Sequence, residues 1–273
     1  MRGGVLKPGP GRAALASLGV AMILGGCATP PPAADAAARA ALAPTGKLRA
    51  GVYRGSPTSY IEGGEPRGVG YDLGREMAGA LGVPFEPAIF PSNAQLLDAV
   101  KAGQVDVVLT NATEERRRFI DFADTVLQIE KSYLVAAGST IADAAAVDRA
   151  GVRVGVSQGS SSQAELGREL KRAAIVPVPS LKEASRLLAE RQLDAFGTNN
   201  AILHEMSDGL PGSRVLPGRW GVESFALGIP KGRDAGRAWL QSFARSARST
   251  GIVARAAARA GLRGTIEASA PSR

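Results

Sequence analysis

The chain has 273 residues, a formal net charge of +8, one histidine and one cysteine, Cys27. A single thiol excludes an intramolecular disulfide and a cysteine-based zinc cluster. The basic residues are dispersed, without the aromatic-interleaved basic strips or finger spacings typical of nucleic-acid-binding proteins. We therefore expect no metal ion, no cofactor and no nucleic-acid partner.

The N-terminus has the pattern of a secretory signal. Three basic residues precede an uncharged stretch, residues 13–26, that is short for a membrane span. It ends in Leu-Gly-Gly directly before Cys27, which resembles the lipobox of bacterial lipoproteins, where the cysteine is lipidated and becomes the mature N-terminus. The resemblance implies a signal peptide over residues 1–26, a membrane anchor through lipid on Cys27, and an exported protein on the periplasmic or other extracytoplasmic face of the cell envelope.

The segments at the two ends of the chain differ in composition from the middle. Residues 27–44 are rich in Ala and Pro, with little that could form a core, and we expect a tether. The folded part is then expected to begin near Thr45. Residues 266–273 are expected to form a disordered tail.

From Lys47 onward, apolar runs of strand length alternate with segments of helical period, which predicts a doubly wound α/β architecture with parallel strands. Strands are predicted in two groups of three and as one returning strand: 48–53, 83–90 and 105–110; 152–156, 174–178 and 193–197; and 224–230. One helix is predicted over 71–82, and three more begin at capping pairs, in which a serine is followed three residues later by Gln or Glu. A long helix is predicted from about Asp234, and a second, basic helix ends near Gly264. The capping pairs are Ser92 with Gln95, Ser162 with Glu165, and Ser180 with Glu183.

One motif carries a specific resemblance. Thr113-Glu114-Glu115-Arg116 is followed by Ile120-Asp121-Phe122-Ala123, which is similar to the T-x-E-R…D-F-S element of the polar-amino-acid class of periplasmic solute-binding proteins. Further segments occur in that family's order: KLRAGVYRG, GVGYDLGREMAGALGV, LLDAVKAGQVDVVLT, VRVGVSQGSSS and QLDAF. The resemblance covers nearly everything from Thr45 to Gly264.

The resemblance implies a two-lobed periplasmic-binding-protein (venus-flytrap) fold, each lobe a mainly parallel sheet flanked by helices. Lobe 1 is expected over residues 45–134 and 225–265, lobe 2 over 135–224, with two crossings as a hinge. Such a protein is a monomer and not an enzyme. It captures a small polar organic solute, an amino acid or a related carboxylate, and presents it to an ABC permease; the same capture could instead serve a sensor.

Arg116 is the expected anchor of the ligand. Its planar fork of donors suits a carboxylate, and it follows a strand end, where ligands bind in open α/β sheets. The neighbouring Arg117 and Arg118 are expected to be solvated. A serine-rich helix start in the second half offers hydroxyl and backbone N–H donors for a polar group. The candidate ligand-binding residues are Tyr53, Asn93, Asn111, Thr113, Arg116, Ser157, Gln158, Gly159, Ser160, Ser161 and Asn199.

Two positions depart from the family pattern. Asn199 stands where amino-acid binders of this family have an acid that receives the ligand ammonium. A neutral amide lacks that charge, so this substitution favours a carboxylate ligand without an ammonium group, or one bound through other groups. The usual aromatic clamp position falls near Asn93, which leaves few stacking residues.

Two enzyme hypotheses compete with ligand capture. Gly155 to Gly159 matches G-x-S-x-G around Ser157, and Asp194 and His204 follow in the order of a hydrolase triad. These three residues are too close in sequence for an α/β hydrolase, and no HGGG-type segment precedes them. The second hypothesis is a cyclohexadienyl or prephenate-type dehydratase, which the same fold can host.

Overall fold

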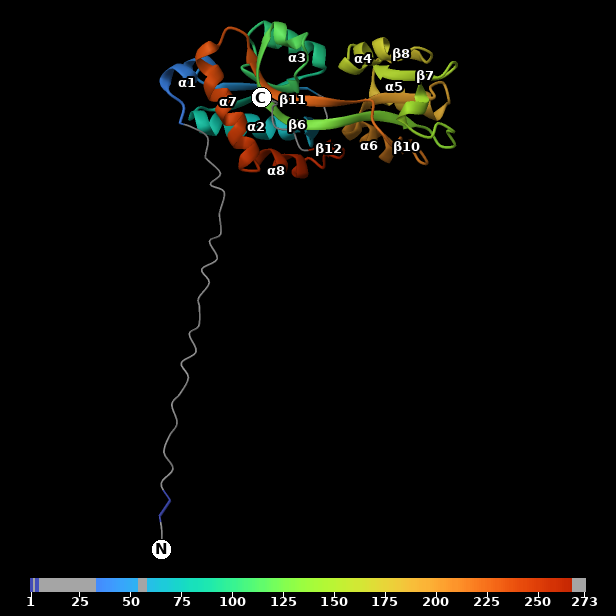
Figure 1. Cartoon of the computed structure of the whole chain (residues 1–273). Coiled ribbons are helices and arrows are strands. Elements are labelled where there is room, and N and C mark those ends of the chain that lie inside the picture. The colour runs from blue at the N-terminus through green and yellow to red at the C-terminus, as the bar shows by residue number, and fades with distance from the viewer. Residues whose placement is uncertain (2, 5–32, 54–57, 267–273) are drawn as a thin grey trace.

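The computed structural model describes residues 1, 3–4, 33–53 and 58–266, and two lobes joined by two long strands make up the folded part (Figure 1). Cys27 and nearly all of the predicted signal peptide lie outside the described residues. No helix in the described part of the chain is both long and apolar enough to cross a bilayer.

The larger lobe contains the first predicted βαβ units. β1 (Leu48–Tyr53) pairs in parallel with β4 (Phe85–Phe90) on one side and with β5 (Val107–Asn111) on the other. α2 (Val69–Leu81) and α3 (Asn93–Lys101) are the crossover connections between these strands. A short hairpin of β2 (Tyr60–Glu62) and β3 (Glu65–Arg67) precedes α2.

The two crossover helices of this lobe begin at the predicted position or within two residues of it. The Ser92 hydroxyl accepts a hydrogen bond from the Gln95 amide at 3.3 Å, so Ser92 is the N-cap of α3. α2 starts two residues before the predicted position and buries Leu73, Met77 and Leu81 in the main core. The prediction for this unit is confirmed.

The smaller lobe repeats the same arrangement. Three parallel strands, in the spatial order β9-β7-β8, alternate along the chain with three helices. The elements are β7 (Arg153–Ser157), α4 (Ser161–Glu169), β8 (Ala174–Val178), α5 (Leu181–Ala189), β9 (Ala195–Asn199) and α6 (Asn200–Asp208). The Ser180 hydroxyl caps α5 by accepting from the Glu183 amide at 3.1 Å, as predicted.

The predicted cap of α4 is wrong by two residues. Ser160, not Ser162, is the N-cap, and its hydroxyl accepts from the Gln163 amide at 3.1 Å. Ser162 is buried within the helix. β9 also begins two residues later than predicted, because Asp194 lies before the strand and binds Arg153.

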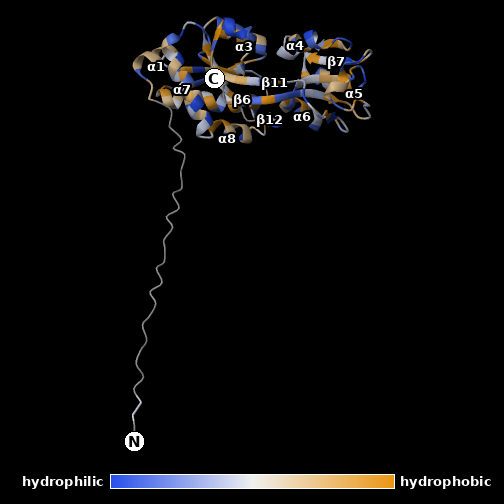
Figure 2. Cartoon of the chain, viewed as in Figure 1, coloured by the Kyte–Doolittle hydropathy of each residue, from blue (hydrophilic) through white to orange (hydrophobic). Residues whose placement is uncertain are grey.

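Two long antiparallel strands connect the lobes. β6 (Ile120–Val135) has 16 residues and pairs with β11 (Gly221–Pro230) along most of its length, then with β9 and the short β10 (Arg214–Val215). In the described residues, ten strands thus form one sheet with the path β4-β1-β5-β11-β6-β9-β7-β8. The sequence predicts β11 but not β6. Hydrophilic residues at 128 and 130–132 interrupt the apolar pattern of β6 where it passes between the lobes (Figure 2).

The C-terminal elements cover the larger lobe. α7 (Asp234–Ser249) begins where predicted, whereas α8 (Ile252–Arg259) ends well before Gly264. The chain then turns, and β12 (Thr265–Ile266) pairs with β6. Ile266, the first residue of the predicted disordered tail, is thus part of a strand, and the rest of that predicted tail, residues 267–273, lies outside the described residues.

The predicted tether contains a helix of the larger lobe. α1 (Ala36–Leu42) is capped by Asp35, whose carboxylate accepts from the Ala38 amide at 2.7 Å. Leu42 is fully buried in the main core and packs against Gly236 of α7. The folded part thus starts before Thr45, because these small apolar residues find a partner far along the chain.

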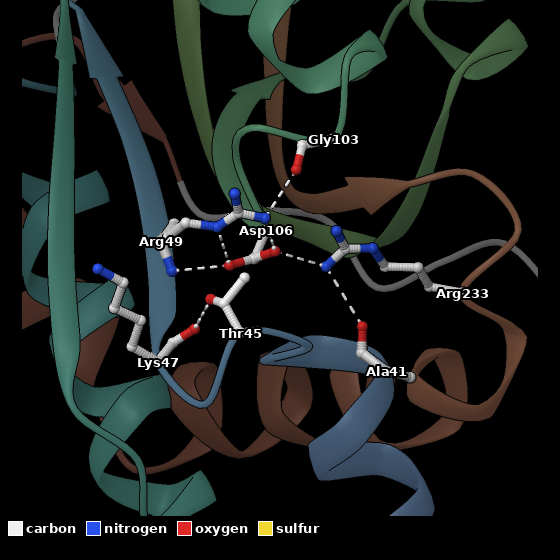
Figure 3. Close-up of polar contacts among 7 residues, drawn as sticks. All are labelled: Ala41, Thr45, Lys47, Arg49, Gly103, Asp106 and Arg233. Carbon is white, nitrogen blue, oxygen red and sulfur yellow. Dashed lines mark hydrogen bonds and ion pairs between the residues drawn. The ribbon is translucent and has the colours of Figure 1, made fainter.

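Each lobe contains one arginine–aspartate pair at the same place in its βαβ units. At the start of β1, Arg49 binds Asp106 through both its backbone amide and its guanidinium, and Arg233 binds the same carboxylate at 2.8 Å (Figure 3). Arg233 also donates to the carbonyl of Ala41 at 3.2 Å, which ties α1 to the sheet. At the start of β7, Arg153 binds Asp194 in the same way.

Candidate ligand-binding cleft

A cavity of about 640 Å³ lies between the lobes. Its walls come from the segment after β5, the C-terminal half of α3, the loop before α4 and α4 along its length, and the two crossing strands. Six predicted ligand-binding residues line it: Asn111, Thr113, Arg116, Gly159, Ser160 and Ser161. Residues that are far apart in sequence therefore meet at the carboxyl ends of the parallel strands.

Arg116 offers an unoccupied donor fork. It is the first residue of η1 (Arg116–Arg118), and its Nη1 donates to the Thr110 hydroxyl at 2.6 Å and to the Asn111 carbonyl at 3.2 Å. Among the described residues its Nε and Nη2 have no partner and it makes no ion pair. Burial lowers the pKa of the Arg116 guanidinium, against smaller opposing effects of Tyr53 and Glu223. The arrangement leaves two parallel N–H donors for a carboxylate.

The two neighbouring arginines behave as the sequence predicts. Arg117 and Arg118 are exposed, and Arg117 lies over the ring of Phe122, 5.5 Å from its centroid. They share a helical turn with Arg116, yet only the Arg116 side chain enters the cavity lining.

The serine-rich loop before α4 lines the cavity with three of its five predicted ligand-binding residues. The Gly159 amide donates to the Gln163 side chain at 2.7 Å, so this N–H is already occupied within the loop. Gly159 has φ +73°, a backbone conformation that favours glycine. Ser157 and Gln158 are absent from the cavity lining, and the Gln158 amide donates to the Val178 carbonyl. Ser161 is the member of this loop that makes contacts across the cleft, as described below.

Three further candidates lie around the cavity without lining it. Tyr53 ends β1 close enough to Arg116 to influence its pKa. Asn93 is the first residue of α3, and its Oδ1 is buried without a hydrogen-bond partner in the described structure. Asn199 ends β9, and its Oδ1 caps α6 by accepting from the Ile202 amide at 3.2 Å.

A residue that the sequence analysis missed connects these candidates. Glu223 of β11 is 8% exposed. Its Oε1 accepts hydrogen bonds from Asn111 at 3.2 Å and from the Ser161 hydroxyl at 3.1 Å. Its Oε2 accepts from Asn199 at 2.8 Å. One carboxylate on a crossing strand thus contacts predicted ligand-binding residues of both lobes. Glu223 directly precedes the strand predicted over 224–230, so an ionisable residue next to an apolar predicted strand is the signal that could have indicated it.

Lys131 of β6 is the second missed residue. Its side chain is 2% exposed, forms an ion pair with Glu165 of α4, and lies over the Trp220 ring with Nζ 4.4 Å from the centroid. Glu165, predicted only as part of a helix cap, therefore neutralises a buried cation at the cavity wall. The sequence gives no comparable signal for Lys131, because β6 itself is not predicted.

The hydrolase hypothesis does not fit this geometry. Both oxygens of Asp194 accept hydrogen bonds from Arg153, at 2.9 and 3.1 Å. His204 lies on α6, where burial lowers its pKa most, followed by the nearby Arg263. A triad needs the aspartate to bind and orient the histidine, and here the aspartate is already engaged elsewhere.

Comparison with known proteins places the chain in a family. Residues 48–260 match the model of the bacterial extracellular solute-binding proteins, family 3. The ABC transporter glutamine-binding protein GlnH of Bacillus subtilis is 26% identical over 176 residues, which are 63% of this chain and 64% of that relative. The chain thus spans somewhat less than two thirds of that relative's length.

Solved structures show the same fold. The L-cysteine receptor of Neisseria gonorrhoeae superposes with a TM-score of 0.70 at 22% identity, covering 81% of this chain and 92% of that one. An ancestral amino-acid-binding protein, described as a precursor of cyclohexadienyl dehydratase, gives a TM-score of 0.69 at 21% identity, covering 81% and 97%. The fold is therefore the two-lobed periplasmic-binding fold that the sequence predicts, and the chain belongs to the bacterial extracellular solute-binding proteins, family 3.

Proposed function

We propose that this protein captures a small amino acid or a related carboxylate between its lobes and delivers it to an ABC-type importer. The observation that carries the proposal is the free donor fork of Arg116 at the wall of a cavity between the lobes. The family assignment supports it, since the curated relative is a glutamine-binding protein of an ABC transporter.

The proposed capture works by closure of the lobes. A ligand carboxylate on Arg116 is held by the larger lobe, while Ser161 and Asn199 approach from the smaller one. β6 and β11 are the two strands about which the lobes move. In this proposal lobe 1 consists of residues 45–134 and 225–265 together with α1, and lobe 2 of residues 135–224, as expected from the sequence. Closure is favoured only by contacts to both lobes, because a ligand shifts an equilibrium by its differential affinity for the two states.

The location is part of the proposal. A signal peptide and lipid on Cys27 would hold the protein, as a monomer, at the extracytoplasmic face of a membrane, next to its permease. The extracellular solute-binding family supports export.

The test is a thermal-shift panel on the purified full-length chain, with amino acids, keto acids, dicarboxylates and simple esters. A ligand at 100 times its Kd adds about 2.7 kcal/mol to the free energy of unfolding, or roughly 5–10 °C for a protein of this size. Arg116→Ala should abolish the shift, whereas Arg117→Ala, a matched loss of one exposed arginine from the same turn, should retain it. If no solute stabilises the protein, or if Arg116→Ala keeps the full shift, the proposed anchor is wrong.

A further inference from the structure

The lobes also contact each other on the face of the crossing strands opposite the ligand cavity. Figure 1 shows α3 and α4, which line that cavity, on one side of β6 and β11, and α6, α8 and β12 on the other side. On this second side, a hollow of about 360 Å³ is lined by residues of both lobes, among them Ala201 of α6 and Arg263 after α8. The lobes therefore meet on two faces that the crossing strands separate.

An ion pair joins the lobes on the second face. Arg263, in the segment after α8, donates from Nη1 to one oxygen of Asp208 at 3.1 Å and from Nη2 to the other oxygen. Asp208 is the last residue of α6. The pKa of the Arg263 guanidinium is raised, mainly by its hydrogen bonds to Asp208 and further by the charge of Glu205, one turn earlier on α6. The two paired side chains are 47% and 65% exposed, so their attraction is modest.

The backbone beside this pair is packed closely. Gly264 lies against Asn200, the first residue of α6, and a Cβ at Gly264 would lie 2.3 Å from the Asn200 Cβ. The next residue, Ala201, is buried in the main core of the larger lobe. A rotation about β6 and β11 that widened the ligand cavity would press these segments together. The contact therefore limits how far the lobes can open.

We propose that Arg263 and Asp208 are affinity-determining residues outside the cavity, and that their ion pair holds the lobes open. Closure of the cavity moves α6 away from the segment after α8, because the crossing strands lie between the two faces, and this movement separates the pair. The pair thus lowers the fraction of closed protein, and the apparent affinity falls in proportion to that fraction. The effect on affinity rests on the proposed function, whereas the effect on the lobes does not.

The separation of the lobes can be measured without a ligand. Cys27 is the single cysteine of the chain, so a Cys27→Ser background accepts two new cysteines for spin labels. Gln95→Cys on α3 and Gly167→Cys on α4 place the labels on opposite lobes, outside the cavity lining. A Cβ at Gly167 meets no atom within 4 Å. Double electron–electron resonance on the full-length chain then gives the distribution of distances between the lobes.

Arg263→Glu replaces the attraction to Asp208 and Glu205 by repulsion. Loss of an exposed ion pair changes an equilibrium constant by up to about 5-fold, and a like-charge contact changes it by a similar factor again. We therefore expect the ratio of closed to open protein to rise by about 2- to 25-fold, which increases the population at short distance. Arg259→Glu is the matched control, because Arg259 is 55% exposed and pairs with Asp72 of α2 within the larger lobe. It should leave the distribution unchanged.

An exchange of charges tests the pair itself. Arg263→Glu combined with Asp208→Arg restores an ion pair in the reverse direction and should restore the distribution of the unaltered chain. The proposal is overturned if Arg263→Glu leaves the distances unchanged or lengthens them. An equal shift in Arg259→Glu also overturns it, since the loss of any arginine from this segment would then have the same effect.

Isothermal titration calorimetry with L-glutamine measures the effect on affinity. Arg263→Glu should bind L-glutamine more tightly than the unaltered chain by the same factor of about 2 to 25, and Arg259→Glu should bind it equally. A shift in distance with an unchanged, measurable affinity overturns the role of the pair in affinity. If the distance shifts but L-glutamine binds neither the unaltered chain nor any variant, the ion pair holds the lobes as proposed, and the proposed capture fails for this amino acid instead.

Discussion

The two lobes use the same arginine–aspartate pair in different surroundings. In both, an arginine at the start of the first strand donates its backbone amide and its guanidinium to an aspartate just before the third. The backbone-to-carboxylate distances are 3.0 Å for Arg49 and 2.8 Å for Arg153. The Nη2 of each arginine also donates a hydrogen bond to a main-chain carbonyl, at 2.7 Å in the larger lobe and 2.5 Å in the smaller.

Burial separates the two pairs. The Asp106 side chain is fully buried and Arg49 is 18% exposed, whereas the Asp194 and Arg153 side chains are 33% and 42% exposed. The buried aspartate has a second cation, Arg233, which also holds α1 (Figure 3). A solvated carboxylate is stabilised by water, but a buried one depends on its protein partners. The same pair is thus a local support in one lobe and the centre of a three-element junction in the other.

Removing the buried carboxylate should have the largest effect on stability. Asp106→Asn leaves two poorly solvated guanidinium groups without a counter-charge, and breaking such a pair costs about 3–5 kcal/mol. For a protein of this size that lowers the Tm by roughly 6–20 °C. Thermal unfolding followed by circular dichroism measures it. A decrease below about 2 °C would mean that water reaches this junction and that the contrast between the lobes is wrong.

The matching substitution in the smaller lobe should lower the free energy of unfolding much less. Asp194→Asn removes an ion pair that is partly exposed, for which about 1 kcal/mol is the upper expectation, equivalent to about 2–4 °C in Tm. The same unfolding experiment provides the comparison. If Asp194→Asn proves as damaging as Asp106→Asn, the geometry of the pair rather than its burial determines its contribution.

The smallest effect is the pH dependence of the Asp194 pair. Hydrogen bonds from the Arg153 side chain are the main reason that the pKa of the Asp194 carboxyl lies below its usual value. A carboxyl with a lower pKa in the folded state stabilises the protein above its unfolded pKa of about 3.9, and this contribution is lost as the pH falls through the folded-state pKa. The difference between the unaltered protein and Asp194→Asn should be constant from about pH 5 to 8 and shrink below about pH 4. Urea unfolding at pH 7 and at pH 3 measures this. A difference that persists at pH 3 would exclude charge as its origin.

The parallel strands and crossover helices could be predicted because their signals are local. Strand β1 is a short apolar run, and Ser92 and Ser180 each cap a helix through an amide three residues on. The cap of α4 was misplaced because Ser160, Ser161 and Ser162 are consecutive and any of them has the chemistry of a cap. Helix α1 was missed since its stabilising partner, Gly236, lies almost 200 residues further along the chain.

The candidate site was predictable on one side only. Arg116 lies in a motif with a family resemblance, and its free fork agrees with the role expected for it. Glu223 and Lys131 have no such motif, and their burial depends on the approach of strands and helices from different parts of the chain. The inference about the ligand drawn from Asn199 did not include the Glu223 carboxylate, which accepts a hydrogen bond from Asn199.

The contact between α1 and α7 has a consequence for the order of folding. The Arg233–Ala41 hydrogen bond joins residues 192 positions apart, so α1 cannot make this contact until the start of α7 has been synthesised. β7, β8, β9 and their helices, in contrast, come from one continuous stretch of chain and can assemble while synthesis continues. Because long-range contacts form late, we expect the smaller lobe to be structured on the growing chain before the larger lobe is complete.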